Sequence, residues 1–233
     1  MGSAAYGSYE IGTLWVYHTD LTDISASKMN GYQEAELTYA RSGHAWHRAA
    51  VGQPFLPHGG EGDWDRGNLQ CASQPVFLPD EIRYYYMGTD KRHSRHWELE
   101  PQTAGLGLAT LKPDRFVALV AGAQEAELMT MPFTPVRGPL YLNALTASDG
   151  WVRLEMTDVF GKPLAGFELE RCAPLSGDHL RQAVRWVEAD TINLPVGEAV
   201  RLRLRAKRAR VYSIASAEPE EVGTDYRFSA ARP

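Results

Sequence analysis

The segment QPFLPHGGEGDWDRG at residues 53–67 places two carboxylates beside a tryptophan, as Asp63, Trp64 and Asp65. Carboxyl groups protonate a leaving oxygen or activate water in glycoside hydrolysis. A flat indole covers the apolar face of a pyranose ring. The spacing therefore predicts sugar chemistry, with Asp65 and Asp63 as candidate catalytic residues. Both aspartates are also suited to capping a turn before a strand, and this structural alternative stays open.

Other polar residues are expected to complete such a site. Arg66 and His93 are suited to binding sugar hydroxyls or to tuning an acid, and Trp64 is suited to stacking on a ring. Glu34, Glu36 and Glu98 are weaker candidates for the catalytic carboxylates. The predicted substrate-binding set is Trp64, Arg66, His93, His58 and Glu36.

A metal site is a weaker alternative. His93 and His96 form an H-x-x-H pattern, and Asp90 or Glu98 would complete a ligand set. Three basic residues stand among them, and positive charge repels a divalent ion. We therefore predict no metal and no cofactor. A third alternative is an esterase or metal-dependent hydrolase that uses the two histidines.

Composition excludes several functional classes. The 233 residues include 24 basic and 29 acidic side chains, a formal charge of −5, which argues against nucleic acid as the main partner. The longest apolar run, 116–123, is far shorter than the ~20 residues that span a bilayer, so no membrane partner is expected. The first residues, MGSAAYGSYE, show no secretory signal, and the compartment stays unassigned. Cys71 and Cys172 support no disulfide framework, and Cys71 is expected to be a small buried hydrophobe.

Alternating and β-branched runs predict an all-β fold. Val152, Leu154 and Met156 alternate with polar residues, a period typical of a half-buried strand. The basic run 201–210 alternates in the same way, so its arginines are expected on an exposed sheet face rather than in a nucleic-acid site.

A weak repeat of about seventy residues suggests propeller blades, each with strands A to D. Leu37 matches Leu108, and Trp46 matches Phe116. The first blade is predicted at 12–19 (B), 35–41 (C) and 45–49 (D), with A at 4–10 or missing; the second at 68–78 (A), 81–87 (B), 105–111 (C) and 115–120 (D). The predicted domains are partial β-propeller blades at 1–122, an antiparallel β-sandwich at 123–217, and a tail at 218–233 for which disorder is one prediction.

The strand order brings three long connections to one face. In antiparallel blades, the B–C and D–A connections emerge on the same side. Residues 20–34, 52–67 and 88–104 are those connections, and long loops on a rigid scaffold usually carry function.

The stretch GEGDWDRGNLQCASQPVFLPDEIRYYYMGTDKRHS, followed by GLGLATLKPDRFVALVAG, resembles the last blade of a five-bladed β-propeller. The proteins concerned are bacterial relatives of glycoside hydrolase families 32 and 43. The run at 139–186 resembles the β-sandwich that follows the propeller in them, and the similarity covers roughly residues 10–215. By resemblance, residues 63–67 and His93 line the mouth of the propeller channel.

The family's catalytic carboxylates lie mainly on earlier blades, and no WMND-like, RDP-like or E-C motif occurs here to receive them. The resemblance therefore implies a glycoside hydrolase family 43-like fold and an oligosaccharide or polysaccharide substrate, without catalytic residues. The favoured prediction is a glycoside hydrolase, or a remnant of one, that acts on oligosaccharides through the carboxylates at the channel mouth. A non-catalytic carbohydrate-binding module or scaffold that uses the same loops is the alternative function. Because about two blades cannot close a ring, we also expect a homo-oligomer that completes the propeller.

Overall fold

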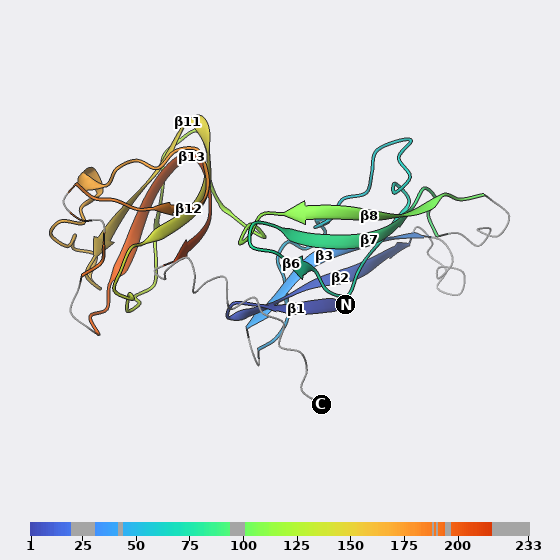
Figure 1. Ribbon diagram of the computed structural model, residues 1–233, viewed down its shortest axis with the longest axis horizontal. Coiled ribbons are helices and arrows are strands. Elements are labelled where there is room, and N and C mark those ends of the chain that lie inside the picture. Colours follow the sequence, from blue (N-terminus) through green and yellow to red (C-terminus); the bar gives the residue numbers. More distant parts are fainter. Residues whose placement is uncertain are drawn as a thin grey trace. The chain divides into compact units, whose positions relative to one another are not determined.

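The computed structural model describes residues 1–19, 31–41, 44–93, 101–187, 189, 191–193 and 197–215. These residues form antiparallel sheets, none of them closed, which confirms the all-β prediction. The one helical element among them is the 3₁₀ turn η1 (Leu169–Arg171). The chain divides between Lys112 and Pro113 into two compact units (Figure 1). We call them the first unit and the second unit.

The first sheet of the first unit is a meander of four consecutive strands. Its spatial order is β1 (Gly2–Tyr6), β2 (Tyr9–Thr19), β3 (Gly31–Arg41) and β4 (His47–Arg48). The β1–β2 turn is tight, because Tyr6 pairs with Tyr9 and Gly7 adopts a positive φ of 57°. The four strands lie in the region predicted for the first blade, and β1 overlaps the range 4–10 in which its first strand was expected if present.

The second sheet is built around β7 (Ile82–Thr89). Along one edge of β7 pair β5 (Asn68–Cys71) and β6 (Val76–Phe77), and along the other pairs β8 (Ala104–Leu111). This arrangement matches predicted strands A, B and C of the second blade, with strand A interrupted between β5 and β6.

The predicted fourth strand of this sheet, 115–120, is wrong. The chain instead forms β9 (Leu119–Ala121), which pairs with β13 in the second unit. Asp114 has a positive φ of 65°, and this turns the backbone just after β8. Arg115 then donates to Oδ1 of Asn143 at 3.0 Å, and its guanidinium lies over the ring of Tyr212. These contacts explain why the first unit ends at 112 rather than at 122, the boundary expected from the sequence.

Buried side chains of the two sheets form the core of the first unit. The connection between β4 and β5 packs on the first sheet, because the amide of Phe55 donates to the carbonyl of Ala35 at 2.7 Å. The Phe55 ring meets Tyr84 edge-on. Cys71 is buried, as predicted, and burial raises its pKa to about 11.

The second unit is organised around two long strands, β11 (Tyr141–Thr157) and β13 (Arg201–Ala215). Its sheet has the order β10 (Ala126–Met129), β13, β11 and β12 (Asp178–Ala183), and β9 also pairs with β13. The alternation in β13 buries Leu202 and Leu204 and places arginines on the other face, as predicted. Acidic neighbours meet these arginines, in the pairs Arg203–Glu155, Arg203–Glu127 and Arg205–Glu127.

A β-sandwich would have a second sheet packed on this core. Among the described residues, irregular segments take the place of that sheet. Phe167, Leu175 and Trp186 belong to the same core as β11 and β13, but they pair through isolated bridges at most. The indole Nε1 of Trp186 donates to the carbonyl of Leu154. The predicted tail lies outside the described residues.

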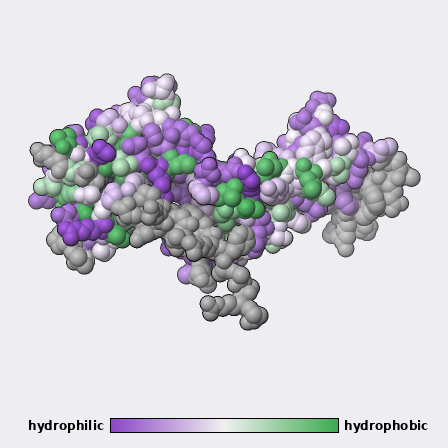
Figure 2. All heavy atoms as spheres, in the orientation of Figure 1, coloured by the Kyte–Doolittle hydropathy of each residue, from purple (hydrophilic) through white to green (hydrophobic). Residues whose placement is uncertain are grey.

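Within the described residues, no helix has the length and apolar character needed to cross a membrane. Figure 2 shows hydrophobic residues scattered between hydrophilic ones on the visible face of both units. Among the large hydrophobic side chains on strands of the first unit, Leu106 of β8 has the largest exposed fraction, 85%.

Candidate functional site

Asp63 caps a turn in the loop that precedes β5. Its Oδ2 accepts the backbone N–H of Gly60 at 2.7 Å, and its own N–H donates to the Gly60 carbonyl at 3.1 Å. Gly62 supplies the positive φ of 92° within this turn. The structural alternative left open by the sequence is thus the arrangement observed for this aspartate, whose side chain is exposed.

Trp64 and Asp65 both pack against Tyr86 of β7. The indole stacks on the Tyr86 ring at 5.9 Å between centroids and an interplanar angle of 10°. The Tyr86 hydroxyl donates to Oδ2 of Asp65 at 2.7 Å. Glycines make room for both: a Cβ at Gly88 would lie 2.6 Å from the Asp65 Cβ, and one at Gly105 would lie 3.0 Å from the Trp64 ring. Trp64 is therefore half-buried against the sheet.

The hydroxyl of Tyr86 stays protonated and acts as a donor. Burial raises its pKa to about 12, and the hydrogen bond to Asp65 acts in the same direction. One oxygen of Asp65 is consequently engaged by a permanent donor.

Arg66 and Gly67 brace the loop against the end of β7. Arg66 is exposed, and its Nε donates to the carbonyl oxygen of Asp90 at 3.2 Å. Gly67 donates to the carbonyl of Thr89 at 2.8 Å. A Cβ at Gly67 would lie 2.2 Å from the carbonyl carbon of Lys91, so these two backbone segments touch. The position of residues 89–91 therefore depends on glycine at 67.

His58 belongs to a separate cluster around Glu34. Its Nε2 donates to the Gln33 carbonyl at 3.0 Å, and its Nδ1 lies 3.7 Å from Oε1 of Glu34. On the other carboxylate oxygen, Nε2 of His18 lies 3.0 Å from Oε2. The ring of Tyr32 stacks on His18 and meets His58 edge-on. The structure thus brings His58 together with Glu34, as two histidines flanking one carboxylate.

Glu36 requires a correction, because it lies out of reach of any ligand in this structure. The residue is fully buried, and both carboxylate oxygens accept hydrogen bonds from the guanidinium of Arg48. Oε1 also accepts the backbone N–H of Gly52 at 3.0 Å. The side chain at this position on β3 points into the unit rather than towards the loop face.

A cavity of about 220 Å³, lined mostly by residues with polar side chains, opens beside the end of β7 in the first unit. His93 is the one predicted site residue among its lining residues. The cavity floor comes from one face of β5 and β7, where Asn68 pairs with Thr89 and Gln70 with Met87. Its described lining residues are Asn68, Gln70, Met87, Thr89, Lys91, Arg92, His93 and Gln102.

The amides of the cavity floor are held in place by β3. Oδ1 of Asn68 accepts the backbone N–H of Gln33 at 2.6 Å. The Gln70 side chain donates to the Gln33 side chain at 2.7 Å. Sequence reasoning missed Gln70 as a site residue. The signal was present, because residues two apart on a strand share a face, and Gln70 follows Asn68 by two.

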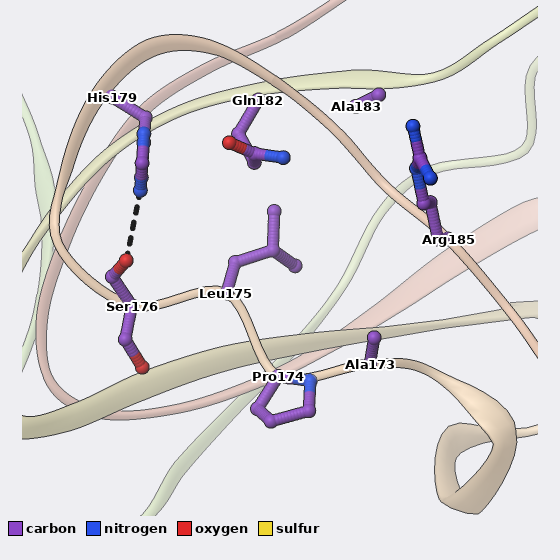
Figure 3. A pocket seen from close by; sticks show the side chains of 8 residues that line it. All are labelled: Ala173, Pro174, Leu175, Ser176, His179, Gln182, Ala183 and Arg185. Carbon is purple, nitrogen blue, oxygen red and sulfur yellow. Dashed lines mark hydrogen bonds between the residues drawn. The ribbon is translucent and has the colours of Figure 1, made fainter.

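A second cavity, of about 260 Å³, lies in the second unit beside β12 (Figure 3). His179 Nε2 contacts the carbonyl oxygen of Ser176 at 2.8 Å, and the Ser176 hydroxyl donates to the Gly150 carbonyl. Two of its polar side chains thus already have partners within the unit, and Leu175 points into the middle. The cavity at His93, which gathers more polar side chains, is the stronger candidate.

In the part of the chain that the structure describes, no three histidine, cysteine or acidic side chains converge in a way that could hold a metal ion. His96 and Glu98, named above as alternatives, lie outside the described residues.

Comparison with protein-family models, with curated proteins and with solved structures finds no match to this chain. The resemblance to glycoside hydrolase families 32 and 43 stays a prediction.

Proposed function

We propose that the first unit binds carbohydrate through the cavity at His93 without cleaving it. The observation that carries the proposal is the set of polar side chains among the residues that line this cavity. Asn68, Gln70 and Gln102 contribute amides, which can both donate to and accept from sugar hydroxyls. Thr89 adds a hydroxyl, and Met87 offers an apolar contact for the C–H face of a ring.

Hydrolysis by Asp65 and Asp63 is the second proposal. A glycosidase needs two carboxyl groups that face one ligand across the scissile bond. Asp65 accepts from the Tyr86 hydroxyl, and Asp63 accepts from the turn that it caps. Neither carboxylate is among the lining residues of the cavity that the structure describes. Binding is therefore the better supported function.

The architecture that we propose for this function is a partial β-propeller followed by a β-sandwich. Its support is the chain-ordered meander β1 to β4 and the order of predicted strands A, B and C in the second sheet. Antiparallel order also places the loop 52–67 and the residues after β7 at the same end of these sheets, as the contact of Gly67 with Lys91 requires.

Titration calorimetry of the full chain with plant oligosaccharides tests the binding proposal. We expect saturable binding at one site per chain. Gln102→Ala should weaken it about tenfold, since a well-placed hydrogen bond contributes about 1 kcal/mol or slightly more. Gln53→Ala, an exposed glutamine outside the cavity, is the matched control and should bind as the wild type does. Absence of heat with every sugar would overturn the proposal.

Product analysis separates binding from hydrolysis. Long incubation of the wild-type chain with the bound oligosaccharide should release no shorter sugar. Product formed by the wild type and abolished in Asp65→Asn would instead establish the glycosidase. The fold of this variant is expected to survive, because the side-chain carbonyl of the substituted amide still accepts the Tyr86 hydroxyl.

Self-association is a further proposal, supported by β8. Within the described residues β8 pairs with β7 alone, so its outer edge presents backbone groups that can pair with a second copy. Leu106 and Leu108 stand on its exposed face opposite Met87 and Tyr85. We expect sedimentation analysis at micromolar concentration to show a mass above 25.9 kDa, and Leu106→Lys to lower it. A monomer mass at all concentrations would contradict the proposal.

A further inference from the structure

We propose that the second unit contains a separate binding site for a small carboxylic acid with an apolar body. The site is the cavity of about 260 Å³ beside β12, which we call the β12 cavity. Arg185 receives the carboxylate, and the apolar residues that line the cavity hold the body. This inference goes beyond the carbohydrate binding proposed for the first unit and does not depend on it.

The β12 cavity lies inside a segment of the chain whose two ends meet. The amide of Ala173 donates to the carbonyl of Arg185 at 2.9 Å, and this bond joins the ends of the segment 173–185. Figure 3 shows the chain passing around the cavity between these two residues. Leu175 is held on its other side by two backbone hydrogen bonds with Val152, each of 2.9 Å. Surface loops whose ends lie close together are frequently functional.

A β-bulge in β12 turns two polar side chains towards the same face. Gln182 pairs with Leu142 and His179 pairs with Ala144, so two residues of β12 oppose Asn143 alone. Residues three apart on a regular strand point to opposite faces, and the extra residue of a bulge reverses this. Leu142 and Ala144 are buried in the core, so His179 and Gln182 lie on the side of the sheet that faces it. Both line the cavity.

The guanidinium of Arg185 is free to receive a ligand. The side chain is exposed, and it has no hydrogen-bond or ion-pair partner within the part of the chain that the structure describes. None of the lining residues is acidic. The acidic residue next to His179 in sequence, Asp178, forms an ion pair with Arg115. A guanidinium binds a carboxylate through two parallel hydrogen bonds, so one arginine matches one carboxylate in charge and in shape.

The other polar lining residues differ in what they can offer. Nε2 of His179 contacts the Ser176 carbonyl at 2.8 Å, and the Ser176 hydroxyl donates to the Gly150 carbonyl at 2.8 Å. These two residues therefore form walls that are fixed before a ligand binds. Gln182 is directed into the space between His179 and Arg185 (Figure 3), where its amide can donate to the same carboxylate.

Apolar residues make up the rest of the lining, in Ala173, Pro174, Leu175 and Ala183. The amides of Ala173 and Leu175 are already bonded, and proline has no N–H, so these three residues present no unpaired donor. Sites for small molecules are mostly apolar, with a few polar groups that fix orientation. A sugar would place hydroxyls against this apolar lining without partners, which costs free energy. An acid with an apolar body uses both parts of the cavity.

Titration of the full chain, followed by NMR spectroscopy, tests the inference with three probes. Phenylacetate has both the carboxylate and an apolar body, phenylacetamide lacks the charge, and acetate lacks the body. We expect phenylacetate to bind about tenfold more tightly than either of the others, because a hydrogen bond to a charged group and burial of a ring each contribute more than 1 kcal/mol.

Two variants test the two parts of the site. Arg185→Gln should lower the affinity for phenylacetate about tenfold and leave that for phenylacetamide unchanged. Ala173→Leu should weaken both probes, because the Ala173 side chain points into the cavity and a larger one would fill it (Figure 3). Ala173 is exposed, so the fold should accept the change. The matched control is Arg210→Gln, at an exposed arginine of the same unit outside the cavity, and all affinities should stay as in the wild type.

Each outcome either supports the inference or overturns it. Loss of phenylacetate binding in Arg185→Gln, with binding retained in Arg210→Gln, supports the assignment. Equal affinity for phenylacetate and phenylacetamide would overturn the role of the carboxylate. An equal loss in the two arginine variants would report only the change in overall charge, and unchanged binding in Arg185→Gln and Ala173→Leu would place the acid elsewhere. Either result, or no binding of any probe, would overturn the site and leave the carbohydrate proposal for the first unit unaffected.

Discussion

Replacing Glu36 by glutamine is expected to lower the free energy of unfolding of the first unit by about 2 kcal/mol, the range for hydrogen bonds to a charged group, because the arginine left without its carboxylate, Arg48, is one-third exposed. The carboxylate is fully buried and accepts two hydrogen bonds from Arg48 and one from the Gly52 amide. These bonds connect β3 to β4 and to the turn that begins the loop 52–67. Urea unfolding of the two proteins, followed by tryptophan fluorescence, measures the difference.

The matched control is Glu81→Gln. Glu81 also pairs with an arginine, Arg83, but both side chains are about one-third exposed, so this variant should lose less than about 1 kcal/mol. An equal decrease in the free energy of unfolding in the two variants would show that burial of Glu36 does not strengthen its ion pair.

The same pair predicts how stability depends on pH. The hydrogen bond from Arg48 lowers the pKa of Glu36 below its ordinary value of 4.5, although burial acts in the opposite direction. Because the folded pKa lies below the unfolded one, the contribution is complete above the unfolded pKa and is lost as pH falls through the folded pKa. We expect the gap between wild type and Glu36→Gln to be constant near neutral pH and to close below about pH 4.

Replacing Gly67 by alanine is expected to lower the free energy of unfolding by about 3 kcal/mol, the upper end of the cost of overpacking. Sugar binding should also weaken about tenfold. The added Cβ would lie 2.2 Å from the Lys91 carbonyl carbon and 2.6 Å from its nitrogen. Since these are backbone atoms, no side-chain rotation relieves the overlap. The shift would also break the Gly67–Thr89 hydrogen bond and move Lys91 away from the cavity.

Gly60→Ala is the matched control in the same loop. A Cβ there would meet Oδ2 of Asp63 at 3.5 Å, an ordinary contact. We expect wild-type stability and wild-type sugar affinity, measured by urea unfolding and calorimetry. If Gly67→Ala behaved in the same way, residues 89–91 would not be held where the structure places them.

Strand alternation was the part of the fold most readable from the sequence. Val152, Leu154 and Met156 alternate with polar residues and are fully buried in β11. The fate of residues 115–121 was not readable, because a short apolar run indicates that a strand forms but not with which partner it pairs. The pairing was decided by a network of side chains distant in sequence, in which Arg115 meets Asn143 and Tyr212.

The candidate site was predicted only in part for a similar reason. Residue types indicated polar chemistry between Asp63 and His93, but types do not state which side chains are already engaged. Asp65 was expected to face a ligand and instead receives the Tyr86 hydroxyl, while Glu36 is withdrawn by Arg48. Gln70 and Thr89 belong to no recognisable sequence motif. They became candidate site residues once the register of β5 on β7 was known.

Because β9 pairs with β13 and not with the sheet of β7, the structure also defines where the chain could be cut to exchange one unit between proteins. A fragment starting at 123, the boundary suggested by the repeat, would leave behind the strand that covers the edge of β13 at Ala209–Val211. It would also remove Arg115 from Asn143 and Asp114 from the hydroxyl of Ser213. A cut after 112 keeps all of these within one piece. In recombination between proteins of this architecture, residues 113–122 would therefore travel with the second unit.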